Sequence, residues 1–167
     1  GYNAGYTIGN GSSNVYIGPN AGYLNTSGNS GVFIGDQAGY YNNANSYNTY
    51  IGYYSGHGTV STSTGAYNTF LGYYAGGSIG NGNSNVFIGP KSGSNTTPGS
   101  SNVFIGHQAG FYNNANYYNT YIGYNTGLGT ATTSTGNLNT FLGYNAGYTI
   151  GNGSSNVFIG PNAGFYN

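Results

Sequence analysis

Residues 14–22 read Asn-Val-Tyr-Ile-Gly-Pro-Asn-Ala-Gly, and variants of this nine-residue phrase recur along the whole chain. Their shared form is Asn-Val/Thr-Phe/Tyr-Ile/Leu-Gly-x-x-Ala/Ser/Thr-Gly. The central glycines are separated by 17 or 20 residues and are Gly18, Gly35, Gly52, Gly72, Gly89, Gly106, Gly123, Gly143 and Gly160. A fixed short period is typical of one supersecondary unit stacked on copies of itself. The sequence therefore predicts a stack of coils, and residues at one position in successive coils are called a row below.

A longer period is superimposed on the short one. Four consecutive spacings span 71 residues, and residues 1–15 recur unchanged at 143–157, twice that distance along the chain. Residues 36–45 recur with two changes at 107–116. We therefore expect residues 1–167 to form one continuous repeat array. Because Gly1 aligns with Gly72 and Gly143, we also expect the chain to be a segment of a longer array.

Each coil combines strand-forming and turn-forming residues. Val, Tyr and Ile at 15–17 favour a strand, and Gly18 and Gly22 mark corners, since glycine takes backbone angles that other residues avoid. Residues 25–31 contain Asn, Thr, Ser and Gly, which favour turns, and a weaker second strand is expected from about 21 to 25. These residue types are poor helix formers. The prediction is an all-β fold, a parallel β-solenoid of stacked 17–20-residue coils with a 71-residue four-coil super-repeat.

Three rows are the candidate structural positions. The Ile/Leu row is Ile17, Ile34, Ile51, Leu71, Ile88, Ile105, Ile122, Leu142 and Ile159. The aromatic row is Tyr16, Phe33, Tyr50, Phe70, Phe87, Phe104, Tyr121, Phe141 and Phe158. The asparagine row is Asn14, Asn48, Asn68, Asn85, Asn102, Asn119, Asn139 and Asn156, and the remaining copy has Gly31. We interpret the asparagine row as a ladder of stacked side-chain amides, which stabilise cross-β stacks.

The strand is apolar on both faces, because alternate residues face opposite sides of a strand. Val15 and Ile17 share one face and Tyr16 lies on the other. Two arrangements bury both faces: chains that associate along their length, or a wide coil that covers its own aromatic residues. Because every copy keeps Ile or Leu, we expect a charge at Ile88 to cost several kcal/mol. A charge at Phe87 distinguishes the two arrangements.

Composition excludes most chemistry. The chain has one acidic residue, Asp36, one basic residue, Lys91, no cysteine and no net charge. Binding to nucleic acid or anionic lipid needs clustered Lys and Arg, whereas a neutral chain lacks the usual protection against self-association. No thiolate site or disulfide can form, and no apolar run approaches the length of a membrane span. We therefore expect no nucleic-acid partner and no membrane insertion.

The titratable residues do not form a predicted site. Asp36 and His107 occupy one row, four coils apart, and we interpret that row as a tolerant outward corner rather than a proton relay. His57 lies in another row. Calcium-binding solenoids repeat Asp in every coil, and this chain has one Asp. We therefore expect no catalytic residue, no metal, no cofactor and no enzyme activity.

Several surface features remain as candidate ligand sites. Tyrosine pairs at 53–54 and 73–74 are candidates for glycan contact, and the inserted loops at 58–65 and 129–136 are expected to protrude. Asn-x-Ser/Thr sequons begin at Asn10, Asn25, Asn95 and Asn152, and chance also produces sequons in a chain of this composition. A Thr row for binding ice is interrupted by Val.

The repeats resemble those of known surface proteins. NTYIGYNTG at 119–127, NTFLGYNAG at 139–147 and NVFIGPNAG at 156–164 resemble the head repeats of trimeric autotransporter adhesins and the Asn-Thr-Phe-Leu-Gly arrays of tail-fibre-like bacterial and phage proteins. The resemblance implies a left-handed parallel β-roll, three chains side by side, and a cell or virion surface. It supplies no catalytic residues. The aromatic row departs from the pattern that this resemblance implies, because adhesin-head repeats usually have a small residue at that position.

These features lead to one expected function and one alternative. We expect a structural shaft or filament segment of an extracellular surface fibre, self-associated as a homotrimer or other homo-oligomer. The alternative is an adhesive module that binds glycans or surfaces through the tyrosine corners and the Thr/Ser loops.

Overall fold

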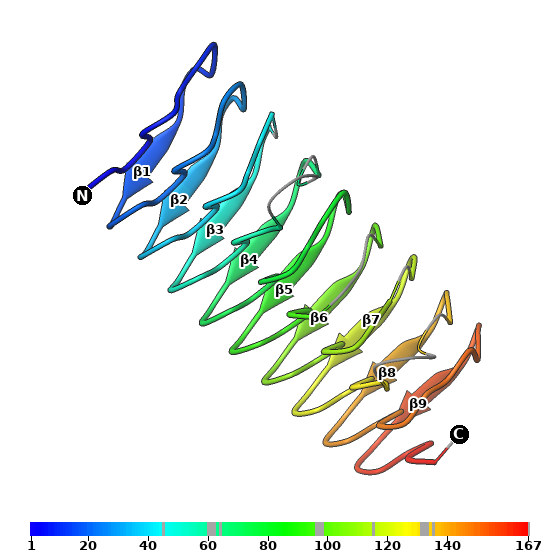
Figure 1. Cartoon of the computed structure of the whole chain (residues 1–167). Coiled ribbons are helices and arrows are strands. Elements are labelled where there is room, and N and C mark those ends of the chain that lie inside the picture. Colours follow the sequence, from blue (N-terminus) through cyan, green and yellow to red (C-terminus); the bar gives the residue numbers. More distant parts are fainter. Residues whose placement is uncertain are drawn as a thin grey trace.

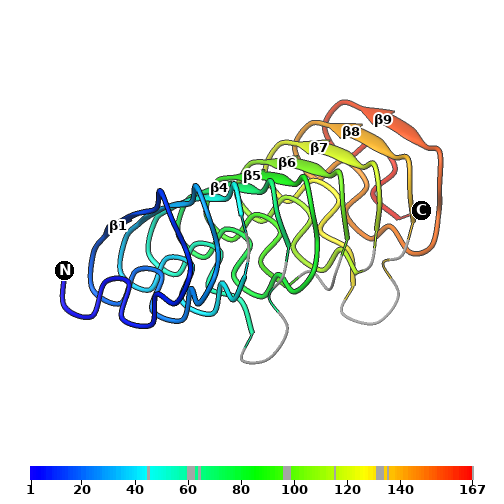
Figure 2. The same cartoon turned by 90° about the horizontal axis from the view of Figure 1, so that it is seen from above.

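The computed structural model describes residues 1–44, 46–59, 63, 65–95, 99–114, 116–130, 134 and 136–166. These residues form nine three-residue strands: β1 (Val15–Ile17), β2 (Val32–Ile34), β3 (Thr49–Ile51), β4 (Thr69–Leu71), β5 (Val86–Ile88), β6 (Val103–Ile105), β7 (Thr120–Ile122), β8 (Thr140–Leu142) and β9 (Val157–Ile159). They form one parallel sheet in chain order (Figure 1). Each coil contributes one strand to one side of the stack (Figure 2). The predicted all-β parallel solenoid is confirmed.

Equivalent residues pair between neighbouring coils. Val15 lies opposite Val32 between β1 and β2, and Thr49 lies opposite Thr69 across a 20-residue spacing. The three extra residues of the longer coils therefore do not shift the strand register. The middles of the loops at 58–65 and 129–136, on which the predicted protrusion depends, lie outside the described residues.

The predicted second strand at 21–25 is wrong, because this part of the coil is a series of turns. Asn20 and Gly22 have φ angles of 52° and 60°, which interrupt an extended backbone. The Tyr23 N–H donates within the coil to the Asn20 carbonyl at 3.2 Å, whereas the Gly22 N–H donates to Ala38 of the next coil at 2.8 Å. Alternating N–H groups thus close turns and join coils, so backbone hydrogen bonds are satisfied without a second strand.

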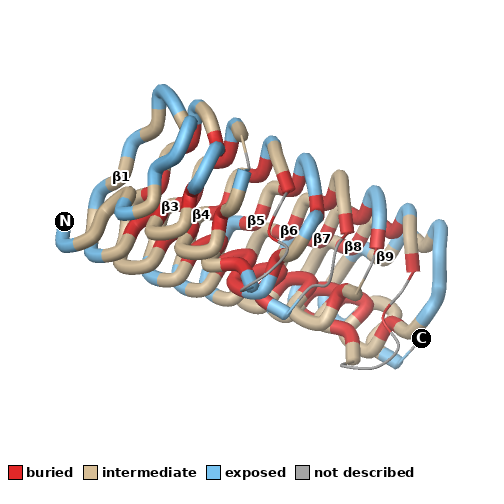
Figure 3. The backbone as a smooth tube through the Cα atoms, turned by 45° about the horizontal axis from the view of Figure 1, so that its top comes forward, coloured by how far each residue is buried: buried red, intermediate tan, exposed pale blue. Residues whose placement is uncertain are grey.

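The aromatic row fills the interior of the coil. Phe33, Phe70, Phe104 and Phe141 are 0% exposed, and in the strands from β2 to β8 the middle residue is the buried one. Buried segments run along the length of the stack (Figure 3). Of the two arrangements left open by the sequence, the structure has the coil that covers its own aromatic residues.

The Ile/Leu row lies on the opposite face of the sheet from the aromatic row. Ile88 is 37% exposed, and Ile17 in the first strand is 55% exposed. Ile88 is therefore not enclosed in the coil, which removes the burial that a cost of several kcal/mol for a charge there would require. The alternation of the strand was predicted correctly, but the aromatic residue rather than the aliphatic one is enclosed.

A glycine beside each ring makes room for the aromatic row. Gly110 has a φ of +62°, and a Cβ atom there would lie 2.5 Å from the ring of Phe104. The preceding residue, Ala109, is 0% exposed. Small residues on the turn side of the coil therefore give the interior space for one ring per coil.

Candidate functional surfaces

The asparagine row forms a buried ladder. The Asn68 Oδ1 accepts the backbone N–H of Asn85 at 2.9 Å, and its Nδ2 donates to the Gly82 carbonyl at 2.8 Å. Asn85 repeats both bonds one coil further on, with Asn102 at 3.0 Å and Gly99 at 2.9 Å. Both side chains are at most 1% exposed. The predicted amide ladder is confirmed, and its polar atoms are engaged in holding coils together.

The ladder is interrupted at Gly31, where the aromatic stack is also irregular. The Phe33 ring is tilted by 24° to Tyr16 and by 32° to Tyr50, whereas Tyr50 and Phe70 are within 5° of parallel. A Cβ atom at Gly31 would lie 2.9 Å from Cζ of Phe33. The ring therefore occupies space that an asparagine side chain takes in other coils.

Tyrosines in the aromatic row place a hydroxyl group in the interior. The Tyr16 hydroxyl accepts a hydrogen bond from Nδ2 of Asn25 at 2.6 Å. Tyr50 and Tyr121 are 2% and 1% exposed, and this burial raises the pKa of both phenols well above the ordinary value, against a smaller lowering by hydrogen bonds to Asn68 and Asn139 respectively. The neutral phenol is the form that suits these positions, so they are structural rather than reactive.

The outward face of the sheet consists of two uncharged rows, the Ile/Leu row and a Val/Thr row, which together we call the outer face. The Val/Thr row is Val15, Val32, Thr49, Thr69, Val86, Val103, Thr120, Thr140 and Val157. Neither row contains a charged residue. Ile122 in β7 is 38% exposed, and Val157 and Ile159 in β9 are 65% and 69% exposed. The outer face therefore presents an aliphatic Ile or Leu side chain on each of the nine strands, beside a Val or a Thr.

One row of residues, at the corner that follows each strand, includes two titratable side chains. Asp36 follows β2 and His107 follows β6, and both are half-buried. The His107 ring stacks on Tyr124 at 5.0 Å. Four coils separate Asp36 from His107, so they form no proton relay, and the outward-corner interpretation describes their placement.

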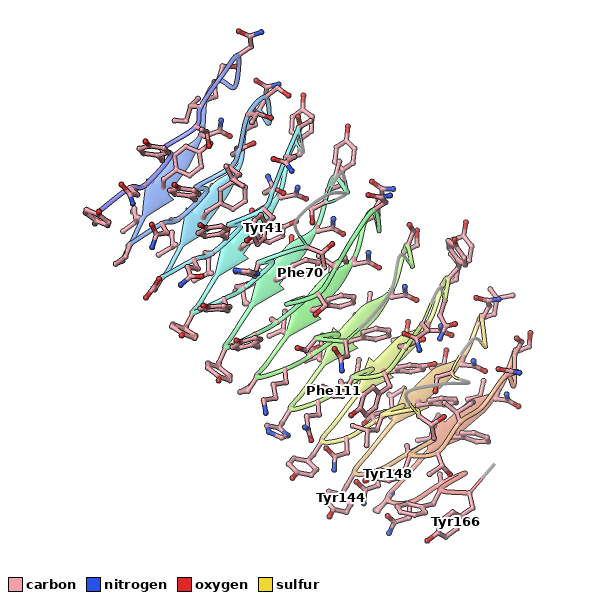
Figure 4. The ribbon with its side chains drawn as sticks, viewed as in Figure 1. Tyr41, Phe70, Phe111, Tyr144, Tyr148 and Tyr166 are labelled. Carbon is pink, nitrogen blue, oxygen red and sulfur yellow. The ribbon has the colours of Figure 1, made fainter. Side chains whose placement is uncertain are left out.

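Surface tyrosines stack along the solenoid rather than presenting their faces to solvent. The rings of Tyr53 and Tyr73 are 5.7 Å apart and within 8° of parallel, and those of Tyr54 and Tyr74 are 4.9 Å apart and within 15°. Tyr144, one super-repeat after Tyr73, lies at the edge of the ribbon (Figure 4). Neighbouring rings cover one another, so the exposed parts are mainly ring edges and hydroxyl groups.

Two features of these surfaces were missed by sequence reasoning. The first is that the aromatic row faces the interior of the coil. A glycine six residues after each ring, such as Gly110 after Phe104, leaves space for the ring, and that spacing is visible in the sequence. The contact of Tyr54 with His57, at 4.6 Å between ring centroids, joins two rows and depends on the folded turn. No sequence signal for this second feature is evident.

The described part of the chain contains no enclosed pocket and no group of three or more His, Cys, Asp or Glu side chains that could hold a metal ion. Nor do the described residues form a helix of the length and apolarity that crossing a membrane requires. Comparisons with protein-family models, with curated proteins and with solved structures found no match to this chain.

Proposed function

We propose that this chain is a structural shaft segment of an extracellular surface fibre, without catalytic activity, and that it associates with further copies of itself through the outer face. The observation that carries the proposal is the uncharged outer face, on which each of the nine strands places an Ile or Leu beside a Val or Thr. Parallel sheets are normally covered on both faces. Here the coil covers one face with its own turns, and a second copy would cover the other.

The size of the outer face indicates how such an association would behave. Nine strands spaced by about 4.8 Å, each about 10 Å long, give a face of roughly 400 Å². Stable interfaces bury about 800 Å² per partner. A single nine-coil segment is therefore expected to associate weakly, and each added super-repeat strengthens the association. This dependence on length suits a fibre.

The remaining parts of the proposal rest on other support. The absence of net charge removes electrostatic repulsion between copies. The placement at a cell or virion surface, and three as the number of chains, rest on the resemblance of the repeats to adhesin heads and tail-fibre-like proteins. The mechanism is mechanical, since hydrogen bonds from coil to coil transmit load along the stack and the number of repeats determines its length.

The experiment compares association across concentrations by analytical ultracentrifugation. The unmodified chain should associate, and Ile88→Asp with Ile122→Asp should remain monomeric with an unchanged circular-dichroism spectrum. Lys91→Asp is the control, because it adds negative charge at a corner instead of on the outer face. A monomer at every concentration, for this chain and for one lengthened by 71 residues, would reject the proposal. So would a double variant that associates as well as the unmodified chain.

The glycan-binding alternative has less support. Stacked ring faces at Tyr53 and Tyr54 are covered by Tyr73 and Tyr74, which leaves little face area for a sugar ring. Glycan-array binding by a chain that stays monomeric would favour that alternative over the shaft.

A further inference from the structure

A large group of contacting aromatic side chains lies on the surface between β2 and the turn after β4. We call seven of its rings the surface aromatic cluster, namely Tyr40, Tyr41, Tyr53, Tyr54, His57, Tyr73 and Tyr74. Tyr40 also stacks on Tyr23, which stacks on Tyr6, so a single column of rings continues toward the first coil. All seven belong to corner and turn residues of three successive coils. Six phenol rings and one imidazole thus form a continuous set of ring contacts outside the core.

Contacts within the cluster run both along and between coils. Tyr53 lies 4.5 Å from Tyr54 in its own coil, and Tyr54 lies 4.9 Å from Tyr74 in the next coil. His57 stacks between Tyr54, at 4.6 Å, and Tyr40, at 5.3 Å. Tyr53 and Tyr73 are 45% and 48% exposed, so the outer part of the cluster is accessible to reagents in solution.

The second super-repeat shows that the fold does not require the cluster. Its equivalents of Tyr40, Tyr54, His57 and Tyr74 are Phe111, Asn125, Leu128 and Asn145. The backbone is the same there, since the residues equivalent to Tyr54 keep φ angles between 51° and 58° throughout the chain. At the corresponding corner Tyr124 stacks on Tyr144 at 5.5 Å and also on His107 at 5.0 Å. The chain therefore contains a cluster of several tyrosines and, 71 residues away, a single tyrosine pair with one histidine neighbour in the same backbone setting.

Composition directs oxidation toward tyrosine. The chain has no cysteine, methionine or tryptophan and has 21 tyrosines. Cysteine and methionine are the usual first targets of oxidants, so in this chain phenols are the most easily oxidised side chains. Contacts among several rings allow a tyrosyl radical to transfer from one ring to another. We therefore expect a radical to persist longer in the cluster than at an isolated ring.

We propose that the surface aromatic cluster is a site of oxidative tyrosine coupling, in which a haem peroxidase with hydrogen peroxide joins Tyr53 or Tyr54 to Tyr73 or Tyr74. The proposal is independent of the shaft function. Each of two tyrosines loses one electron and one proton, and one hydrogen peroxide takes up both electrons and both protons to form two waters. The two phenoxyl radicals form a carbon–carbon bond between ring positions next to the hydroxyl groups. Each ring then transfers its displaced hydrogen to its own oxygen, which restores two phenols.

The consequence is a covalent link between neighbouring coils. Tyr54 and Tyr74 are separated by one of the 20-residue spacings, so the bond closes a loop of that length and limits its freedom in the unfolded chain. It would join the coil of β3 to the coil of β4.

The test treats the full chain, in dilute solution, with a haem peroxidase and a limiting amount of hydrogen peroxide. Peptic peptides joined with the loss of two hydrogen atoms are then identified by mass spectrometry. The expected result is that links from Tyr53 or Tyr54 to Tyr73 or Tyr74 exceed the link between Tyr124 and Tyr144. Equal yields in the two super-repeats overturn the proposal, as does coupling that is concentrated at Tyr2 and Tyr166, which exposure alone favours at 78% and 87%.

Two variants test whether the cluster is the cause. Tyr54→Phe with Tyr74→Phe should lower the Tyr53–Tyr73 link to the yield of the Tyr124–Tyr144 link. The converse variant, Asn125→Tyr with Asn145→Tyr, places the missing phenols in the second super-repeat and should raise its link severalfold. This converse variant still tests the proposal if the first variant fails to fold. An unchanged ratio of the two links in the converse variant rejects the role of the cluster.

Discussion

At the scale of single residues, the turn-side glycines explain why a bulky ring can lie inside so narrow a coil. Gly110 combines a left-handed backbone angle with direct contact to the Phe104 ring, and Gly39 and Gly147 stand in the same relation to Phe33 and Phe141. An added methyl group there meets both backbone strain and an aromatic ring. The repeated glycine is therefore a packing requirement as well as a corner.

We predict that Gly110→Ala lowers the free energy of unfolding by about 3 kcal/mol, from left-handed backbone strain and from overpacking against the ring. Gly151→Ala is the control, since a Cβ atom there meets nothing within 4 Å and its φ is not positive. The control should stay within about 0.5 kcal/mol of the unmodified chain. Urea unfolding followed by circular dichroism measures both, and equal effects would contradict the packing argument.

The buried tyrosines predict a loss of stability in alkaline solution. Burial raises the pKa of Tyr50 and Tyr121 above the ordinary value of 10.0, so above that pH the unfolded chain releases two protons that the native chain retains. The stabilisation that the two buried phenols give the native state is complete below the pKa of the unfolded chain. As the pH rises above that pKa, the free energy of unfolding falls by up to about 2.7 kcal/mol per pH unit for the pair.

Unfolding free energies measured just below the unfolded pKa and about one unit above it test this dependence. Tyr50→Phe with Tyr121→Phe should make the slope shallower, since Phe occupies equivalent positions in other coils. A slope that the double variant leaves unchanged would assign the alkaline sensitivity to other tyrosines.

At the scale of elements, the strand and the asparagine that precedes it both connect neighbouring coils by hydrogen bonds. The strand pairs equivalent residues between coils, while the asparagine before it bonds to the next coil through both side-chain atoms. Buried polar groups are costly to leave unpaired. The ladder is therefore expected to contribute more than its number of bonds suggests.

We predict that Asn85→Ala costs about 3 kcal/mol, because the Asn102 N–H and the Gly99 carbonyl lose a buried partner. Asn83→Ala is the matched control, since Asn83 Oδ1 accepts the Ala66 N–H at 2.8 Å at an exposed position where water can replace it. Its cost should be below about 1 kcal/mol. Thermal melts of the two variants give the comparison, and a control as costly as Asn85→Ala would show that burial is not the reason.

Opposite faces of one strand should respond differently to charge. Phe87→Asp places a carboxylate in the interior, where Phe87 is 1% exposed, and should cost more than about 4 kcal/mol. Ile88→Asp, on the outer face, should cost less than about 1.5 kcal/mol in the monomer. Circular dichroism at a concentration where the chain is monomeric measures both. A greater loss for Ile88→Asp would mean that the outer face is not the exposed one.

At the scale of the whole molecule, the solenoid is a one-dimensional stack whose coils contact mainly their neighbours in the order of the chain. Stability in such arrays is approximately a sum of repeat and nearest-neighbour terms. Length can therefore change in whole coils without disturbing the register of the rows.

We predict that deleting residues 72–142, which joins Leu71 to Gly143 and recreates the sequence at 139–147, leaves a shorter stack with the same type of spectrum. Deleting residues 72–80, about half a coil, should instead place turn residues opposite strands and lower the melting temperature sharply. Melting curves and small-angle scattering distinguish a shorter rod from a disrupted one. Equal melting of the two deletions would contradict the row arrangement.

The sequence by itself determined the period, the strand positions, the register and the amide ladder, because equivalent residues such as Asn68 and Asn85 return at fixed spacing and only a stack places them side by side. It left open which strand face is enclosed, since Val86 and Ile88 on one side and Phe87 on the other are all apolar. The tertiary structure decided that question, because closing the coil brings a glycine against the ring and leaves space on that side only. It also turned the expected second strand into turns and brought Tyr54 against His57. Such contacts depend on the path of the closed backbone, which the periodicity of side chains does not specify.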